Sequence, residues 1–295
     1  MGGKKIMNFV TKEYIPKGWS RDKKYCVTDE AGNRYLLRVS PQGDEAGVKL
    51  AHEMMQRVEA QGVPMCRSLE WGVCEEGPYL LQTWIDGQDA EEKMPQLTEE
   101  EQYRYGWAAG QIARRIHQIP APEGIEDWAD RFNRKADRKI QGYLNCPLRY
   151  EGGDAFIEYI ENNRHLLQNR PQTYQHGDYH VGNMMIDSQG QLQIIDFNRD
   201  DYGDPWEEFN RIVWCAQASP RFASGMVDGY FDGDVPMLFW QLLAFYIASN
   251  TLSSLYWAIP FGEKQVQVMR DQAADVLTWY DGMRNVVPTW YCKEK

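Results

Sequence analysis

The fold is indicated most clearly by two short runs near the middle of the chain, HGDYHVGN at residues 176–183 and IIDF at residues 194–197. The stretch between them consists of two short apolar segments around an Asp-Ser-Gln-Gly turn, a pattern typical of a β-hairpin. Positions equidistant from the turn of an antiparallel hairpin face each other. Asn183 and Asp196 are therefore expected side by side at its open end, next to Asp178. Two carboxylates and an amide suit a hard divalent cation and a positioned base, the requirements of phosphoryl transfer.

The order of these side chains resembles the catalytic and metal-binding loops of the aminoglycoside phosphotransferase family, a small-molecule branch of the protein-kinase-like fold. His176 and Asp178 match its catalytic loop, and Asn183 and Asp196 match its metal-binding positions. The run YGDPWEEF at residues 202–209 is similar to the Gly-Asp-Pro segment that follows the metal-binding aspartate. The resemblance implies an α+β, bilobal protein-kinase-like fold, with a small β-rich N-lobe and a larger, mainly helical C-lobe.

Patterns along the rest of the chain agree with two lobes. The first part carries strand-like stretches and one helical period, at residues 24–28, 34–39 and 79–85 and at residues 44–60, respectively. Helical patterns dominate afterwards. We predict a nucleotide-binding N-lobe at residues 1–86, a hinge at about 82–87, and a C-lobe at 87–295 with the catalytic loop, the metal site and the acceptor pocket. The resemblance implies that backbone atoms of Thr83 and Ile85 recognise adenine.

Further nucleotide contacts in the N-lobe follow from the same resemblance. In kinases, a basic residue on the third strand binds the α- and β-phosphates and pairs with a glutamate of the next helix. Arg38 occupies the matching place, and its guanidinium group keeps the charge of a kinase's lysine and reaches two oxygens at once. Glu53 is expected as its partner, with Glu45 and Glu59 on the same predicted helix as alternatives.

The loop that covers the phosphates departs from the protein-kinase pattern. A Gly-x-Gly-x-x-Gly run is missing, and residues 17–24 read KGWSRDKK instead. Backbone amides of this segment, the Ser20 hydroxyl and Lys23 or Lys24 would bind phosphate oxygens. A solvated basic turn is an equally good interpretation.

The catalytic roles are those that the family implies. Asp178 accepts a hydrogen bond from the acceptor hydroxyl and orients it, and positioning is most of its contribution because little proton removal precedes the transition state. Asn183 and Asp196 hold Mg²⁺, which bridges the phosphates of ATP or GTP. His176 is expected to brace the catalytic loop by a hydrogen bond. Asp204 is either a second brace or an acid that caps the following helix.

The phosphoryl acceptor is expected to be a small, probably cationic molecule with a hydroxyl group. Four acids near the catalytic runs are candidates for binding its amines: Asp200, Asp201, Glu207 and Glu208. Aromatic residues are interleaved with acids further along the chain, which suits a polyamine sugar or a quaternary amine. We therefore expect an aminoglycoside-like acceptor and hence antibiotic resistance. The alternative is a metabolic kinase of the choline, homoserine, methylthioribose or fructosamine type.

Composition limits the partners. The 295 residues contain 32 Lys and Arg against 43 Asp and Glu, a formal net charge of −11, which argues against a nucleic-acid partner. The longest apolar run, at residues 235–248, is too short for a bilayer and is expected to form a core helix. No signal peptide is evident, and the six cysteines lack Cys-x-x-Cys spacing. We expect a cytoplasmic protein without a membrane partner, as a monomer or homodimer.

Two other functions fit part of the pattern. His176, Asp178 and His180 on one face of a strand would suit the transition metal of a hydrolase. Such an enzyme would lose activity to chelators and ignore nucleotide. A catalytically dead binding protein would keep the kinase frame and fail to bind magnesium-nucleotide. The presence of all three core side chains favours the phosphotransferase.

Overall fold

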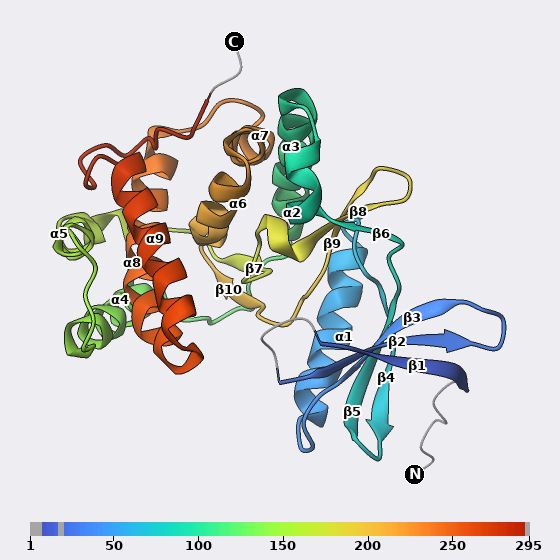
Figure 1. The fold of residues 1–295 in the computed structure, drawn as a ribbon. Helices are drawn as coiled ribbons and strands as arrows, with labels where there is room; N and C mark the ends of the chain where they lie inside the picture. The colour runs from blue at the N-terminus through green and yellow to red at the C-terminus, as the bar shows by residue number, and fades with distance from the viewer. Residues whose placement is uncertain (1–7, 17–20, 293–295) are drawn as a thin grey trace. The chain divides into compact units, whose positions relative to one another are not determined.

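The computed structural model describes residues 8–16 and 21–292 (Figure 1). The chain divides into two units. The first contains the described residues up to Ala90 together with Asn183–Asn198, and the second contains Glu91–Gly182 and the described residues from Arg199 onward. The first boundary thus falls four residues after residue 86. The segment Asn183–Asn198, placed by the sequence analysis in the C-lobe, groups with the first unit.

The first unit is built on an antiparallel five-stranded sheet in the order β1-β2-β3-β5-β4. Its strands are β1 (Phe9–Ile15), β2 (Lys23–Asp29), β3 (Arg34–Val39), β4 (Ser68–Cys74) and β5 (Gly77–Thr83). Helix α1 (Glu45–Glu59) packs against β4 and β5 (Figure 1). Its buried side chains include Val48, Met55 and Val58, which recur at helical spacing and give the helix one apolar face.

The predicted hairpin is present and belongs to a second, three-stranded sheet of the first unit. This sheet has the order β6-β8-β9, with β6 (Gly87–Asp89), β8 (Met184–Asp187) and β9 (Leu192–Ile194). The Asp187 carboxylate accepts hydrogen bonds from the amides of Gln189 and Gln191, each at 2.9 Å, and thereby fixes the turn. Strand β6 pairs with β8, and Ile194 forms a bridge with Met65. These pairings tie the hairpin to the chain before Ala90.

The second unit is mainly helical. Its helices are α2 (Ala90–Lys93, which starts at the boundary), α3 (Glu99–Ile116), α4 (Trp128–Asn145), α5 (Asp154–Asn163), α6 (Ile212–Ala218), α7 (Pro220–Phe231), α8 (Met237–Ala258) and α9 (Glu263–Trp279). Short 3₁₀ turns are η1 (Met94–Gln96), η2 (Arg164–Leu167), η3 (Val181–Asn183), η4 (Glu207–Arg211) and η5 (Ile259–Phe261), and β7 (Thr173–Gln175) pairs with β10 (Asp201–Gly203). The capping box expected at the start of α3 is formed by Thr98 and Glu101.

Close packing of α3 on α7 depends on glycine. A Cβ on Gly106 would lie 2.0 Å from the Phe222 carbonyl oxygen, and one on Gly225 would lie 2.2 Å from that of Tyr103. Only glycine lets the two backbones approach this closely, so these contacts fix the helices side by side (Figure 1).

Helix α8 is the apolar centre of the second unit and is longer than expected. It packs against α4, α5, α9 and η4. It continues past residue 248 because Ser249 and Thr251 are buried inside the protein rather than exposed at a helix end. By length and composition alone, Met237–Phe261 would suffice to cross a membrane, but 67% of its apolar window is buried.

Candidate functional site

The loop that carries Asp178 is held by acceptor and donor groups of the second unit. The amides of His176 and Gly177 donate to the Glu208 carboxylate at 2.5 and 2.9 Å. Gly177 has φ +80°, and a Cβ there would lie 1.9 Å from the Arg199 carbonyl oxygen, so the position requires glycine. The buried His176 accepts a hydrogen bond at Nδ1 from the Asp178 amide at 3.3 Å, a contact of the kind expected for a brace.

Cationic groups surround the Asp178 carboxylate within the same unit. Arg211 Nε lies 3.2 Å from Oδ1, and Arg199 Nη1 lies 3.8 Å from Oδ2. His180 Nε2 is 3.7 Å from Oδ1, and burial lowers the pKa of His180 to about 4, so the imidazole is neutral at neutral pH. Neither arginine was a sequence-based candidate. They lie 21 and 33 positions further along the chain, and no motif marks them.

In the first unit, Arg38 lies among the charged groups of the expected nucleotide site. Its Nε donates to Asp22 at 2.5 Å and its Nη1 donates to Asp196 at 2.7 Å. Lys24 is the cross-strand neighbour of Arg38, and its amine is 3.8 Å from Asp196. Burial lowers the pKa of Lys24, whereas Asp196 and Asp22 outweigh burial and raise the pKa of Arg38. Two cations and two carboxylates thus form one largely buried cluster.

The expected pair of Arg38 with Glu53 is not formed. Glu53 is exposed and lies 3.6 Å from Lys49, one turn earlier on α1. The residue two positions later, Met55, is buried against the sheet, and two positions correspond to about 200° around a helix. Glu53 therefore points away from the strands, and Asp22 takes its expected place on Arg38. Neither alternative glutamate of α1 contacts Arg38 in the described part of the chain.

The two expected metal ligands lie at the open end of the hairpin. The Ile195 amide donates to the Asn183 carbonyl at 3.1 Å, which brings the two strand ends together. Asp196 has φ +69°, a left-handed conformation that non-glycine residues rarely adopt and that is retained mainly at functional positions. Their side-chain oxygens are hard donors, so this pair fits Mg²⁺ in its chemistry. Among the described residues, no group of three or more His, Cys, Asp or Glu side chains gathers around a common centre.

The remaining nucleotide candidates of the first unit differ in position. Ser20 lies outside the described residues. Lys23 is exposed, and its amine is 3.7 Å from Glu76. Thr83 and Ile85 lie where β5 leaves the sheet, and the Thr83 amide donates to the Arg67 carbonyl at 2.9 Å. These positions leave their expected nucleotide contacts as predictions.

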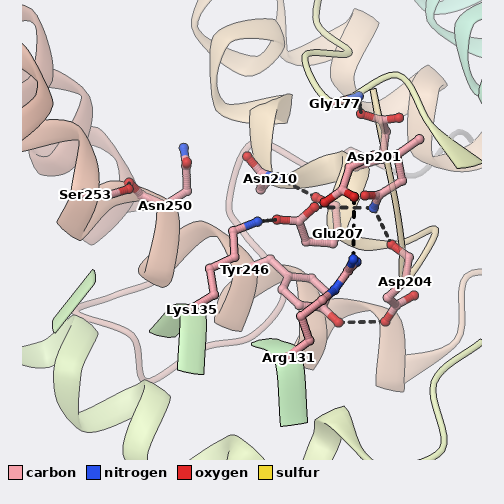
Figure 2. A network of polar contacts seen from close by, with 12 residues as sticks. Arg131, Lys135, Gly177, Asp201, Asp204, Glu207, Asn210, Tyr246, Asn250 and Ser253 are labelled. Atoms are coloured by element: carbon pink, nitrogen blue, oxygen red, sulfur yellow. Dashed lines mark hydrogen bonds and ion pairs between the residues drawn. The ribbon is translucent and has the colours of Figure 1, made fainter. Parts of the chain in front are cut away.

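The four acids expected to bind the acceptor all lie in the second unit and contact other parts of it (Figure 2). Glu208 accepts from the catalytic-loop amides described above. Glu207 accepts from Lys135 at 3.0 Å, and Asp201 lies 3.5 Å from Arg131. Burial raises the pKa of Asp200, which lies beside Tyr174.

Asp204 is fully buried and holds the segment after β10 in place. Its carboxylate accepts from Arg170 at 2.6 and 2.9 Å and from the Tyr246 hydroxyl at 2.7 Å (Figure 2). It also accepts from the Trp206 amide at 3.0 Å, the contact of a cap, and Arg170 stacks on the Trp206 ring with 3.8 Å to its centroid. Asp204 thus acts both as a brace and as a cap.

Replacing Asp22 by asparagine is expected to tighten nucleotide binding about tenfold, because the carboxylate competes with phosphate for the Arg38 guanidinium group. Titration calorimetry with magnesium-nucleotide measures the change. Glu13→Gln, which removes an exposed charge from β1 of the same unit, is the matched control and should leave the affinity unchanged. Unchanged or weaker binding by Asp22→Asn would argue against this competition.

Comparison with known proteins gives one family match and many structural ones. The family model described as "Phosphotransferase enzyme family" matches residues 13–240. No curated protein sequence matches the chain. Similar solved structures include a choline/ethanolamine kinase family protein from Mesorhizobium loti, with a TM-score of 0.67 and 15% identity over 94% of this chain and 91% of that one.

Two further structures are of aminoglycoside phosphotransferases. A thermostable mutant of APH(4)-Ia in a ternary complex with AMP-PNP and hygromycin B has a TM-score of 0.67 and 17% identity, over 92% of this chain and 94% of that one. The GDP complex of aminoglycoside 2'-phosphotransferase-IIIa has a TM-score of 0.66 and 13% identity, over 92% and 93%. These likenesses confirm the expected α+β, protein-kinase-like fold class.

Proposed function

The chain belongs to the phosphotransferase enzyme family, and on that premise we propose that it transfers the γ-phosphoryl group of ATP or GTP to a hydroxyl group of a small molecule. The observation that carries this proposal is the 2.7 Å contact of Arg38 with Asp196, two residues 158 positions apart. A basic residue of the third strand thereby meets the carboxylate expected to bind the metal. This is the arrangement required at the phosphate end of a kinase nucleotide site.

Each group then has a role. Arg38 and Lys24 bind phosphate oxygens of the nucleotide. Asn183 and Asp196 hold Mg²⁺, which supplies charge neutralisation on the triphosphate when bound. Asp178 accepts a hydrogen bond from the acceptor hydroxyl and receives its proton as the oxygen bonds to the γ-phosphorus, while the bond to the β-phosphate oxygen breaks and nucleoside diphosphate leaves.

The identity of the acceptor is the finer part of the proposal. The expected aminoglycoside-like acceptor is supported by similar structures such as the hygromycin B complex, at 17% identity. Against it, Asp201, Glu207 and Glu208, which were expected to bind amines, are paired with groups of the chain. This observation favours the second candidate, a metabolic kinase of a small hydroxylated molecule.

Magnesium-nucleotide is expected to raise the thermal stability of the wild-type protein, by about 2.7 kcal/mol of unfolding free energy at a hundred times its Kd. Arg38→Ala should lose most of this stabilisation, because the phosphates lose a buried guanidinium group. Differential scanning fluorimetry with ATP and GTP, each with and without Mg²⁺, measures the shift. Arg34→Ala, an exposed position of the same strand, is the control and should keep it. An equal shift for Arg38→Ala and wild type would contradict the assigned nucleotide site.

A further inference from the structure

A cluster of cationic side chains lies near Asp178 in the second unit. Arg131, Lys135 and Lys139 follow one another at intervals of four along α4, so they share one face of that helix. Arg211 ends η4, which contains Glu207, the carboxylate that accepts from Lys135. We call Arg131, Lys135, Lys139 and Arg211 the cationic cluster.

Three members of the cationic cluster have an acid beside them. Arg131 lies near Asp201, Lys135 binds Glu207 and Arg211 lies near Asp178, at 3.5, 3.0 and 3.2 Å respectively (Figure 2). Burial alone would raise the pKa of Glu207, but the charges of Lys135 and Lys139 lower it. Glu207 therefore remains a carboxylate, and it already serves Lys135.

Lys139 is the exception. It is half-buried and forms no hydrogen bond or ion pair with any residue that the structure describes. Its charged neighbours are Lys135, Glu207 and Arg211, of which two repel it. Burial and these cations lower the pKa of Lys139 to about 7. A half-buried amine surrounded mainly by cations is unfavourable unless an anion joins it.

Unused hydrogen-bonding groups lie next to this amine's neighbours. Arg211 Nε is buried without hydrogen-bond geometry, and the Arg211 Nη groups donate to no residue in the described part of the chain. The adjacent Asn210 is 8% exposed, and its Oδ1 has no hydrogen-bond partner among the described residues. Its amide nitrogen donates to the Glu207 carbonyl at 2.6 Å, which fixes its position beside the cluster (Figure 2). Buried polar atoms are nearly always paired, so these groups indicate a bound molecule.

We propose that the phosphoryl acceptor carries an anionic group, a carboxylate or a phosphate, which Lys139 and Arg211 bind while its hydroxyl lies at Asp178. This inference rests on the proposed phosphotransferase function. Arg211 matches an oxyanion with its planar pair of donors, and it also contacts Asp178. The anionic group and the reactive hydroxyl therefore belong to one small molecule, with few bonds between them. Asn210 Oδ1 accepts from a second hydroxyl or an amine of the same molecule.

Matched acceptors test the charge. Nucleoside diphosphate release is measured with glycerol, glycerate and glycerol 3-phosphate, with ethanolamine, serine and homoserine, and with choline and kanamycin. The expected result is turnover with a carboxylate or a phosphate member of a set and little with its neutral or cationic counterpart. Comparison of glycerate with glycerol 3-phosphate separates the two anions. Efficient turnover of kanamycin or choline, with the anionic members inactive, would overturn the inference and leave the phosphotransferase function standing.

Lys139→Met keeps the apolar stem of the side chain and removes its charge. It is expected to raise KM for the anionic acceptor by about 10- to 100-fold, the range for a lost charged hydrogen bond. Arg138→Met, the exposed neighbour on the same helix, removes an equal charge and should leave KM within twofold. An equal effect of both variants, or none, would overturn the role of Lys139.

A binding measurement decides the matter if no acceptor of the panel is phosphorylated. Inorganic phosphate and malonate are titrated into wild type, Lys139→Met and Arg138→Met while thermal unfolding is followed. Stabilisation that is lost only in Lys139→Met supports the inference, and equal behaviour of the three proteins refutes it. Loss of magnesium-nucleotide binding by the wild type would instead refute the proposed function.

Discussion

Replacement of Asp178 by asparagine is expected to lower kcat for phosphoryl transfer by about 100- to 10,000-fold, the contribution of a positioned acid–base group. Asparagine keeps the size and one acceptor oxygen of aspartate but cannot receive the proton. It also lacks the charge that faces Arg211 and Arg199. Because the assigned nucleotide contacts, Arg38 and Asp196, belong to the other unit, Kd for magnesium-nucleotide should stay within about threefold of wild type.

The matched control is Asp234→Asn, which changes an exposed acid of the same unit. Both variants are compared with wild type in steady-state kinetics with the acceptor that the panel identifies, and in nucleotide titrations. Turnover by Asp178→Asn near that of Asp234→Asn would contradict the assignment of Asp178. Loss of both turnover and nucleotide binding would indicate that the variant had lost its fold, and circular dichroism tests that directly.

Asp204→Ala is expected to lower the free energy of unfolding by about 3–5 kcal/mol, the cost of breaking a buried ion pair by removing one partner. Asp204 is fully buried, and its loss strands the Arg170 guanidinium group and the Tyr246 hydroxyl. Urea unfolding followed by tryptophan fluorescence measures the change, and the Trp206 ring beneath Arg170 lies at the disrupted contact.

Two further variants separate the ion pair from its neighbours. Tyr246→Phe removes one hydrogen bond to Asp204 and should cost about 1–2 kcal/mol. The double variant Arg170→Met with Asp204→Leu removes both charges and should recover part of the loss, because no buried charge then lacks a partner. A loss below about 1 kcal/mol for Asp204→Ala would contradict the structural role described here.

Local patterns were sufficient for the elements whose chemistry is contained within a few residues. The hairpin follows from the turn at Asp187, whose side chain bonds the amides that the turn leaves unpaired. The start of α3 follows from the pairing of Thr98 with Glu101. The sequence also indicated a core helix in α8, but not its length, because Ser249 and Thr251 look like exposed residues until the surrounding helices bury them.

Contacts that depend on orientation between elements could not be predicted. Glu53 carries the expected charge on the expected helix, but it lies about half a turn from the buried face. Asp22 replaces it from a loop that no motif distinguishes. Lys135 and Lys139 look like the solvated face of an amphipathic helix, and only the packing of η4 nearby gives them a role.

The central claim, phosphoryl transfer to a small hydroxylated molecule, is tested most directly by following the γ-phosphate itself. Nucleotide labelled with ³²P at the γ-position is incubated with Mg²⁺, the acceptor panel and either wild type or Asp178→Asn, and the products are separated by chromatography. The account predicts that wild type forms a labelled phosphoester of an anionic acceptor and that Asp178→Asn forms almost none. Label that stays on the nucleotide with every acceptor, in a wild-type protein that binds no magnesium-nucleotide, would contradict it.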